Sequence, residues 1–164
     1  MLELVQAQWD VPYIHRTAST RDEFRRVMQE WVKWKYHHYP ILYLGFHGFP
    51  GGIEIGDDAI PVEDLVEFYG KGRGRVIHFS ACGTLDISAK EMRNFLKKTE
   101  FTAACGFNRD VDWLHSTALE ILILDGLSKR KITSRGMHCF GEQLYKMSGS
   151  LARHLGFRIW VKGK

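Results

Sequence analysis

Two short stretches of the sequence each place a reactive side chain and a glycine directly after an apolar run. His47–Gly48 follows the run 41–46, and Cys82–Gly83 follows the run 75–81. A free thiol titrates at about 8.5, so it becomes an effective nucleophile near neutral pH when a neighbouring imidazole accepts its proton. These residue types therefore point to nucleophilic chemistry on the sulfur of Cys82.

The glycines add a second requirement of acyl transfer, which is a set of hydrogen-bond donors for the oxygen that becomes negatively charged. Gly48 has no side chain, so its backbone can approach a substrate carbonyl and offer an N–H group. The N–H of Cys82 itself can supply the other donor. The two motifs together match an oxyanion hole built from backbone amides.

The chemistry requires His47 and Cys82 to meet, and their spacing allows it. They lie 35 residues apart, and the intervening chain reads as a hairpin followed by one helix. A connection of this length makes two strands parallel and lets them be neighbours in a sheet. Since the carboxyl ends of parallel strands share one edge of the sheet, we expect both side chains there.

Hydrophobic periodicity predicts alternating strands and helices along the whole chain. Ser19 or Thr20 and Ser88 are expected to cap two of the helices. This order predicts an α/β three-layer sandwich with a mostly parallel central sheet, formed by residues 1–164 as a single domain. Strands are expected at 12–19, 41–46, 75–81, 101–107 and 157–162, helices at 20–37, 61–70, 88–100, 111–130 and 141–156, and a hairpin at 51–60.

Composition excludes several classes of protein. With 45% hydrophobic and 26% charged residues, the chain is globular rather than disordered. The net charge of +4 is spread over separate segments, so a nucleic-acid partner is not expected. No apolar run reaches the roughly 20 residues that a membrane span needs. The first ten residues lack a signal-peptide pattern, and the three cysteines have no zinc spacing, so we expect a cytoplasmic protein with free thiols and no metal.

The stretches "LYLGFHG" and "VIHFSACGT" resemble the caspase-like (clan CD) cysteine peptidases, most closely the bacterial CHAT branch. That branch pairs a strand-terminal His-Gly with a strand-terminal Ser-Ala-Cys. The likeness extends to "GGIEIGDDAIPVEDL", which is similar to the family's small hairpin and following helix, and to "FTAACGFNRDVDW", which is similar to its next strand and specificity loop. It spans roughly residues 10–161.

The resemblance implies a thiol endopeptidase of caspase-like fold that acts on protein or peptide substrates without a cofactor. It makes Cys82 the nucleophile, His47 the general base or acid, and the amides of Gly48 and Cys82 the oxyanion donors. Asp110 and Asp112 lie in the loop that shapes the substrate pocket in this family, where an acid in several branches accepts a lysine or arginine side chain. The sequence lacks the "QACRG" motif and the processing linker of the best-known members, so a regulatory partner protein is implied rather than self-cleavage.

Each of these residues also has a structural interpretation. Cys82 is alternatively a buried thiol, His47 a turn residue, and Asp112 the cap of a helix that begins at Trp113. Cys105 and Cys139 are interpreted as core or surface thiols, because neither is matched by a histidine motif, and His78 is expected to point into the sheet. The alternative function is a catalytically silent caspase-like module that binds a peptide or a partner protein. A nucleotide-binding domain is less favoured, because "GFHGFPGG" lacks the P-loop lysine and the G-x-G-x-x-G spacing.

Overall fold

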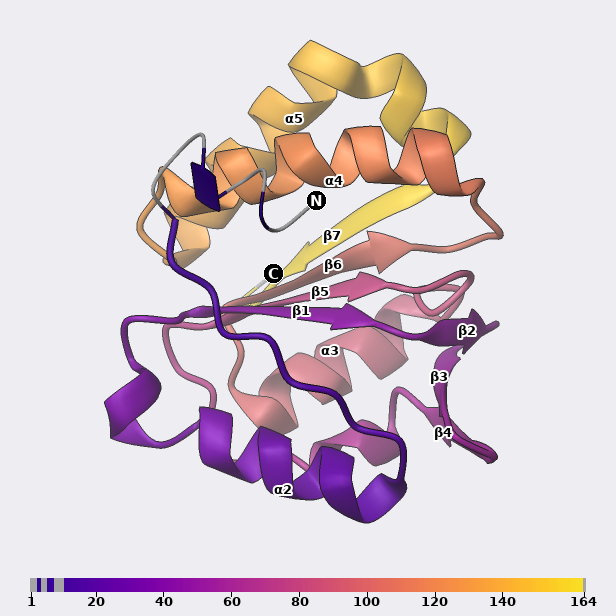
Figure 1. The fold of residues 1–164 in the computed structure, drawn as a ribbon. Coiled ribbons are helices and arrows are strands. Elements are labelled where there is room, and N and C mark those ends of the chain that lie inside the picture. The colour runs from indigo at the N-terminus through magenta and orange to yellow at the C-terminus, as the bar shows by residue number, and fades with distance from the viewer. Residues whose placement is uncertain (1–2, 4–5, 8–10, 164) are drawn as a thin grey trace.

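A four-stranded sheet forms the centre of the molecule in the computed structural model, which describes residues 3, 6–7 and 11–163 (Figure 1). The strand order is β1-β5-β6-β7. The pairs β1·β5 and β5·β6 are parallel, whereas β7 runs antiparallel to β6. The predicted mixed α/β fold with a mostly parallel sheet is therefore confirmed. The strands are β1 (Ile41–Gly45), β5 (Val76–Ser80), β6 (Ala103–Phe107) and β7 (Phe157–Val161).

Helices cover both faces of this sheet. Figure 1 shows α2 (Arg21–Trp31) and α3 (Ala89–Thr99) below the sheet, with α4 (Trp113–Ser128) and α5 (Ser134–His154) above it. Successive residues of a strand point to opposite faces, so a strand that is buried on both sides is apolar throughout. Along β5, for example, Ile77 belongs to the core cluster on the face that α2 and α3 cover. Val76 belongs to the core cluster on the face that α4 and α5 cover. This arrangement agrees with the predicted three layers.

A second, antiparallel sheet extends from the end of β1. It contains β2 (His47–Phe49), β3 (Gly52–Ile55) and β4 (Asp58–Pro61), in that order. The predicted hairpin is β3–β4, whereas strand β2 was not predicted from the sequence. Only Phe46 separates β1 from β2, so the direction of β1 fixes the position of His47.

Local capping signals locate several helix ends. The Thr20 side chain accepts a hydrogen bond from the Glu23 amide at the start of α2, and Ser88 forms a capping box with Glu91 at the start of α3. The predicted helix at 20–37 ends early, at Trp31, and a short 3-10 helix η1 (Trp34–Tyr36) follows. The guanidinium of Arg75 explains this end, because it donates hydrogen bonds to the carbonyl oxygens of residues 31–33.

Three other predictions differ from the structure. Residues 12–19 contain no strand, and this segment makes no ladder with β1. The predicted helix at 61–70 is only a 3-10 helix, η2 (Asp64–Glu67), because Pro61 completes β4 instead of opening a helix. Helix α5 begins at Ser134, seven residues before the predicted start, where the Thr133 side chain accepts a hydrogen bond from the Gly136 amide.

Candidate active site

Strand pairing places His47 and Cys82 at one edge of the central sheet. Gly45, the last residue of β1, pairs with Ser80, the last residue of β5. His47 and Cys82 each lie two residues beyond this pair. Equal offsets from a parallel register bring both residues to the same edge, as the sequence predicts.

Gly48 packs directly against the backbone of Cys82. A Cβ atom added to Gly48 would lie 2.2 Å from the Cys82 carbonyl oxygen, 2.9 Å from its nitrogen and 3.0 Å from the Ala81 Cβ. Real Cβ atoms do not approach backbone atoms this closely, so only glycine fits here. The first residues of β2 and the cysteine turn are therefore in contact.

Four hydrogen bonds hold the cysteine turn in place. On one side, the Gly51 amide donates to the Gly83 carbonyl at 3.1 Å, and the Thr84 hydroxyl donates to the Gly52 carbonyl at 3.0 Å. On the other side, the Gly83 amide donates to Arg109 at 3.0 Å and the Leu85 amide donates to Phe107 at 2.8 Å. Gly83 has a φ of 65°, which favours glycine in such a turn. The turn is thus clamped between the small sheet and the loop that precedes α4.

The Cys82 thiol is partly exposed and lies beside that loop. Its sulfur is 3.9 Å from the carbonyl oxygen of Val111. His47 is exposed, and within the part of the chain that the structure describes the imidazole makes no hydrogen bond to the thiol. The Cys82 amide likewise has no backbone hydrogen-bond partner among the described residues, so its N–H is free to serve a ligand. The two side chains share an edge, but they are not engaged with each other.

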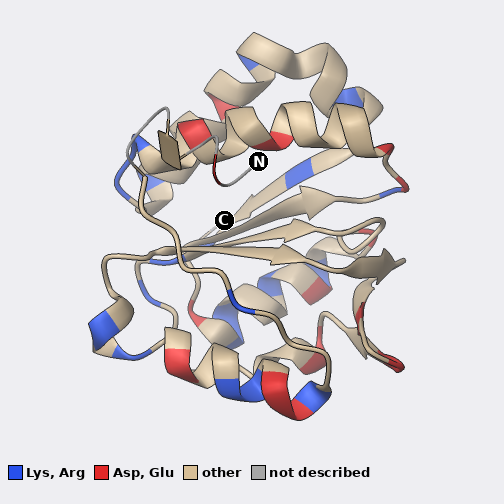
Figure 2. Cartoon of the chain, viewed as in Figure 1, with Lys and Arg blue, Asp and Glu red and all other residues tan. Residues whose placement is uncertain are grey.

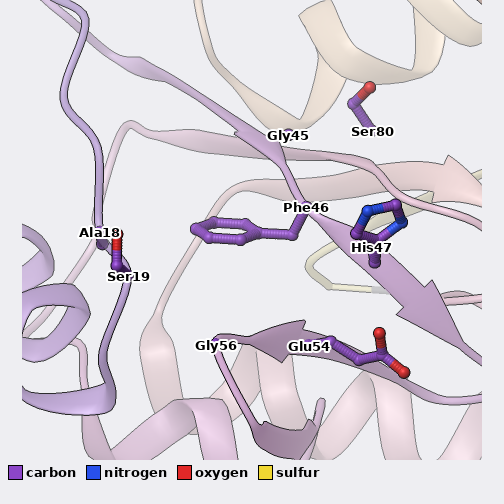
Figure 3. A pocket seen from close by; sticks show the side chains of 8 residues that line it. All are labelled: Ala18, Ser19, Gly45, Phe46, His47, Glu54, Gly56 and Ser80. Atoms are coloured by element: carbon purple, nitrogen blue, oxygen red, sulfur yellow. The ribbon is translucent and has the colours of Figure 1, made fainter.

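A cavity of about 600 Å³ opens beside His47 (Figure 3). Glu54 on β3 is the register partner of His47 on β2, so the two side chains project from the same face of the small sheet. Glu54 was not predicted as a site residue, because its position opposite His47 follows from the β2–β3 register. The cavity is lined by Ala18, Ser19, Gly45, Phe46, His47, Glu54, Gly56 and Ser80.

A buried polar network lies behind Ser80, between the sheet and α4. The Tyr43 hydroxyl is 2.6 Å from the Ser80 oxygen and 2.7 Å from a Glu120 carboxylate oxygen. The other carboxylate oxygen of Glu120 is 3.3 Å from His78 Nε2, and His78 Nδ1 is 3.4 Å from the Cys105 sulfur. A hydroxyl carries one proton, so when Tyr43 donates to Glu120, Ser80 donates to Tyr43. His78 was expected to point into the sheet; it is fully buried, and its side chain faces α4, where it contacts Glu120. Tyr43 and Glu120 were not predicted from the sequence as members of a polar network.

Burial and hydrogen bonding have opposite effects on the pKa of Glu120. Burial raises the pKa of a carboxyl, but the hydrogen bond and charge of His78 and the hydroxyls of Ser80 and Tyr43 bring the pKa of Glu120 below its ordinary value. Burial and the nearby Glu120 charge both raise the pKa of Cys105. Cys105 is therefore an unreactive thiol, despite its contact with an imidazole.

Asp110 and Asp112 lie away from the cavity lining. The Asp112 side chain caps α4, accepting hydrogen bonds from the His115 amide at 2.9 Å and from the His115 imidazole at 2.7 Å. The hydrogen bond from the His115 backbone amide is the main cause that lowers the pKa of Asp112 below its usual range. Asp110 is exposed in the same loop. The cap interpretation of Asp112 is thus confirmed, while a substrate-binding role for either aspartate stays a prediction.

Comparison with known families shows which family the chain belongs to. A family model described as a family of unknown function, DUF6642, matches residues 1–161. The chain belongs to the DUF6642 family. A search of proteins with curated functions found no match.

The described residues contain no group of three or more His, Cys, Asp or Glu side chains placed to hold a metal ion. None of the helices in the described ranges has the length and apolarity needed to cross a membrane. All three cysteines are free, with Cys105 buried and Cys139 exposed.

Replacing Gly48 by alanine tests the contact that joins the two motifs. The new Cβ would clash with backbone atoms of Cys82, so the cysteine turn must shift. We expect the free energy of unfolding, measured in urea, to fall by about 2 kcal/mol. Gly45→Ala is the matched control, because its Cβ would meet only Tyr43 Cε1 at an ordinary 3.5 Å. Equal effects of the two variants would contradict the contact.

Replacing Glu120 by alanine tests the buried network. His78 and Tyr43 lose their charged partner, and we expect the free energy of unfolding at neutral pH to fall by about 3 kcal/mol. The pKa of Glu120 is lowered on folding, so its contribution is present above the ordinary carboxyl value of 4.5 and is lost as the pH falls through the folded-state value. The difference between wild type and Glu120→Ala should therefore shrink in acid. Glu142→Ala, an exposed change on α5, is the control, and a constant difference at all pH values would argue against the assignment.

Proposed function

We propose that this chain is a cysteine endopeptidase of the caspase-like class, which hydrolyses peptide bonds of protein substrates through Cys82 and His47. The observation that supports the proposal most is the pair of equal offsets beyond Gly45 and Ser80, with Gly48 packed against the Cys82 backbone. This arrangement supports the proposal because it brings the backbones of the two motifs into contact at one edge of the sheet. The resemblance to the CHAT branch supplies the reaction class.

The proposed reaction passes through an acyl-enzyme. His47 takes the proton of the Cys82 thiol, and the sulfur attacks the carbonyl carbon of the scissile peptide bond. The N–H groups of Gly48 and Cys82 bind the carbonyl oxygen while it carries negative charge. The carbon–nitrogen bond then breaks, and His47 returns the proton to the leaving amine. Water attacks the thioester with His47 as base, which releases the acid and restores the thiol. No cofactor takes part.

The contact of Cys82 with Val111 defines the first step of this cycle. The thiol must leave the Val111 carbonyl before it can give its proton to His47. The loop that carries Val111 also carries Asp110 and Asp112, which would contact a substrate on the α4 side of the sulfur. A regulatory partner that moves this loop would control the thiol. In this proposal the enzyme works in the cytoplasm on protein or peptide substrates, without nucleic acid or membrane.

The second candidate is a catalytically silent caspase-like module that binds a peptide or partner protein at the same edge. The observation in its favour is that, among the described residues, the thiol contacts a backbone carbonyl and the imidazole makes no hydrogen bond to it. Such a module would keep the cavity and the turn but would not need His47 to activate Cys82. The dependence of thiol reactivity on His47 therefore separates the two candidates.

Covalent labelling by a peptide acyloxymethyl ketone tests the mechanism. We expect this weak electrophile to label Cys82 in the wild type, and Cys82→Ala to abolish labelling. His47→Ala should slow it by about 100-fold, because general-base assistance is lost. Intact mass and peptide mapping locate the label, with Cys139→Ala as the control because Cys139 is the exposed thiol. Labelling that is unaffected by His47→Ala would favour the silent module, and labelling on Cys139 alone would exclude Cys82 as the nucleophile.

A further inference from the structure

The edge of the central sheet opposite the candidate active site brings together segments that lie far apart in the sequence. Strands β1, β5 and β6 begin at this edge and β7 ends there, because β1 and β6 are parallel to β5 and β7 is antiparallel to β6. The hydroxyl of Ser134, the first residue of α5, donates to the Lys162 carbonyl just after β7, so the α4–α5 loop lies there too. The segments that meet at this edge are 32–40, 70–75, 100–102, 129–133 and 162–163.

These five segments, which we call the basic edge, are strongly positive. They contain nine lysine or arginine residues and one acidic residue, Glu100, although the whole chain has 23 basic and 19 acidic residues. At the opposite edge, segments 46–63, 81–88 and 108–112 contain seven acidic residues and one basic residue. Figure 2 shows the same division, with Lys and Arg gathered where β1, β5 and β6 begin and Asp and Glu at the β3–β4 hairpin and the loop before α4. The fold therefore gives the molecule two edges of opposite charge.

Nearby carboxylates neutralise only part of the basic edge. Glu30 and Glu100 each pair with two of its cations, and Asp125 pairs with one. Eight of the nine cations are at least partly exposed, since Arg75 alone is buried. Three carboxylates against eight exposed cations leave a formal excess of five positive charges at the surface. Such a concentration of charge attracts a polyanion.

A small cavity at this edge offers a place for a phosphate group. It has a volume of about 290 Å³, opens at the start of α5, and has Arg130, Lys131 and Arg135 in its lining. Lys131 and Arg135 are exposed, and neither has a carboxylate partner among the residues that the structure describes. The positive end of the α5 dipole adds to the attraction for an anion.

An exposed tryptophan accompanies the cations. Trp34 is 80% exposed, and its ring stacks on His37 with the centroids 4.2 Å apart and the planes 2° from parallel. Lys33 and Lys35 flank it in the sequence. An aromatic ring beside cations is the usual platform for an unpaired base, which stacks on the ring while its phosphates contact the cations.

Two other polyanionic or acidic partners fit less well. A membrane surface requires several exposed apolar side chains that enter it together, and Trp34 is the one large exposed apolar side chain that the described part of the basic edge carries. The acidic edge of a second copy would match the charge, but it would give the stacked ring of Trp34 nothing to bind. Neighbouring strands lie about 4.8 Å apart, so an extended strand of nucleic acid that follows the edge meets one basic segment after another.

We propose that the basic edge binds single-stranded nucleic acid, with phosphates on Lys131, Arg135 and the neighbouring cations and with a base stacked on Trp34. The sequence analysis did not expect this partner because the basic residues lie on separate segments, and the fold removes that objection by bringing the segments together. The hydrolysis proposed above uses no nucleic acid, and the basic edge lies away from His47 and Cys82. This inference therefore goes beyond the proposed function and does not depend on it.

Fluorescence anisotropy with labelled single strands of RNA and of DNA, each about 12 nucleotides long, tests the phosphate contacts. We expect binding to weaken as salt is added, by a slope of about 0.7 in the logarithms for each phosphate contacted. Lys131→Ala/Arg135→Ala should weaken binding about tenfold at low salt and lower this slope by about 1.4. Lys90→Ala/Arg93→Ala, which removes two exposed cations of α3, is the matched control and should keep the wild-type affinity and slope.

Replacing Trp34 by alanine tests the stacked base. We expect affinity for the single strands to fall about tenfold, because one base–aromatic contact is lost, while the salt slope stays the same. Binding of a duplex of the same sequence should not change, because its bases are already stacked on one another. Trp113→Ala is the matched control, since Trp113 is 81% exposed at the start of α4, at the acidic edge. Equal losses in the two variants, or an equal loss for the duplex, would contradict stacking on Trp34.

Three results would overturn the proposal. The first is that no oligonucleotide binds at low salt. The second is binding to vesicles of phosphatidylserine and phosphatidylcholine, measured by sedimentation, without binding to oligonucleotides. The third is self-association in the analytical ultracentrifuge that Lys131→Ala/Arg135→Ala abolishes, again without oligonucleotide binding. Covalent labelling of Cys82 should be the same in Lys131→Ala/Arg135→Ala as in the wild type, so failure of the peptidase and failure of the basic edge are separate observations.

Discussion

The close approach of Gly48 to the backbone of Cys82 is the contact on which the candidate site depends. It joins the end of one strand to the turn after its neighbour, and it tolerates no side chain because a Cβ would lie 2.2 Å from a carbonyl oxygen. The parallel pairing of Gly45 with Ser80 places the two motifs at the same edge of the sheet. The contact of Gly48 then holds the start of β2 against the backbone of Cys82. His47 and Cys82 are thereby placed together by backbone geometry rather than by their own side chains.

Backbone placement leaves the side chains free to change partners. The cysteine turn is bound on one side to the small sheet, through Gly83 and Thr84, and on the other to the loop before α4. Val111, whose carbonyl contacts the thiol, belongs to that loop. A shift of the loop would therefore release the sulfur and also break the hydrogen bond from the Gly83 amide to Arg109, while the two bonds from the small sheet would still hold the turn.

The parts of the fold that depend on local signals could be predicted from the sequence, and the parts that depend on distant contacts could not. Apolar runs identified β1 and β5, and Thr20 and Ser88 identified helix starts, because these signals lie within each element. The early end of α2 depends on Arg75, which is 44 residues from Trp31 and takes the final carbonyls of the helix. The position of Glu54 could not be predicted for the same reason, since its place opposite His47 comes from the β2–β3 register.

Access decides which of two thiol–imidazole pairs can act in this molecule. Cys105, His78 and Glu120 have the residue types of a nucleophile, a base and an orienting acid. The Cys105 sulfur lies 3.4 Å from His78 Nδ1, and His78 Nε2 lies 3.3 Å from a carboxylate oxygen of Glu120. Yet Cys105 and His78 are both 0% exposed, and burial raises the pKa of the Cys105 thiol. No substrate reaches that sulfur, and the charge of Glu120 opposes its ionisation. Cys82 is partly exposed and His47 is exposed, so of the two pairs this is the one that solvent reaches. The buried set instead links α4 to β1 and β5, and through Tyr43 it fixes the Ser80 hydroxyl at the wall of the cavity.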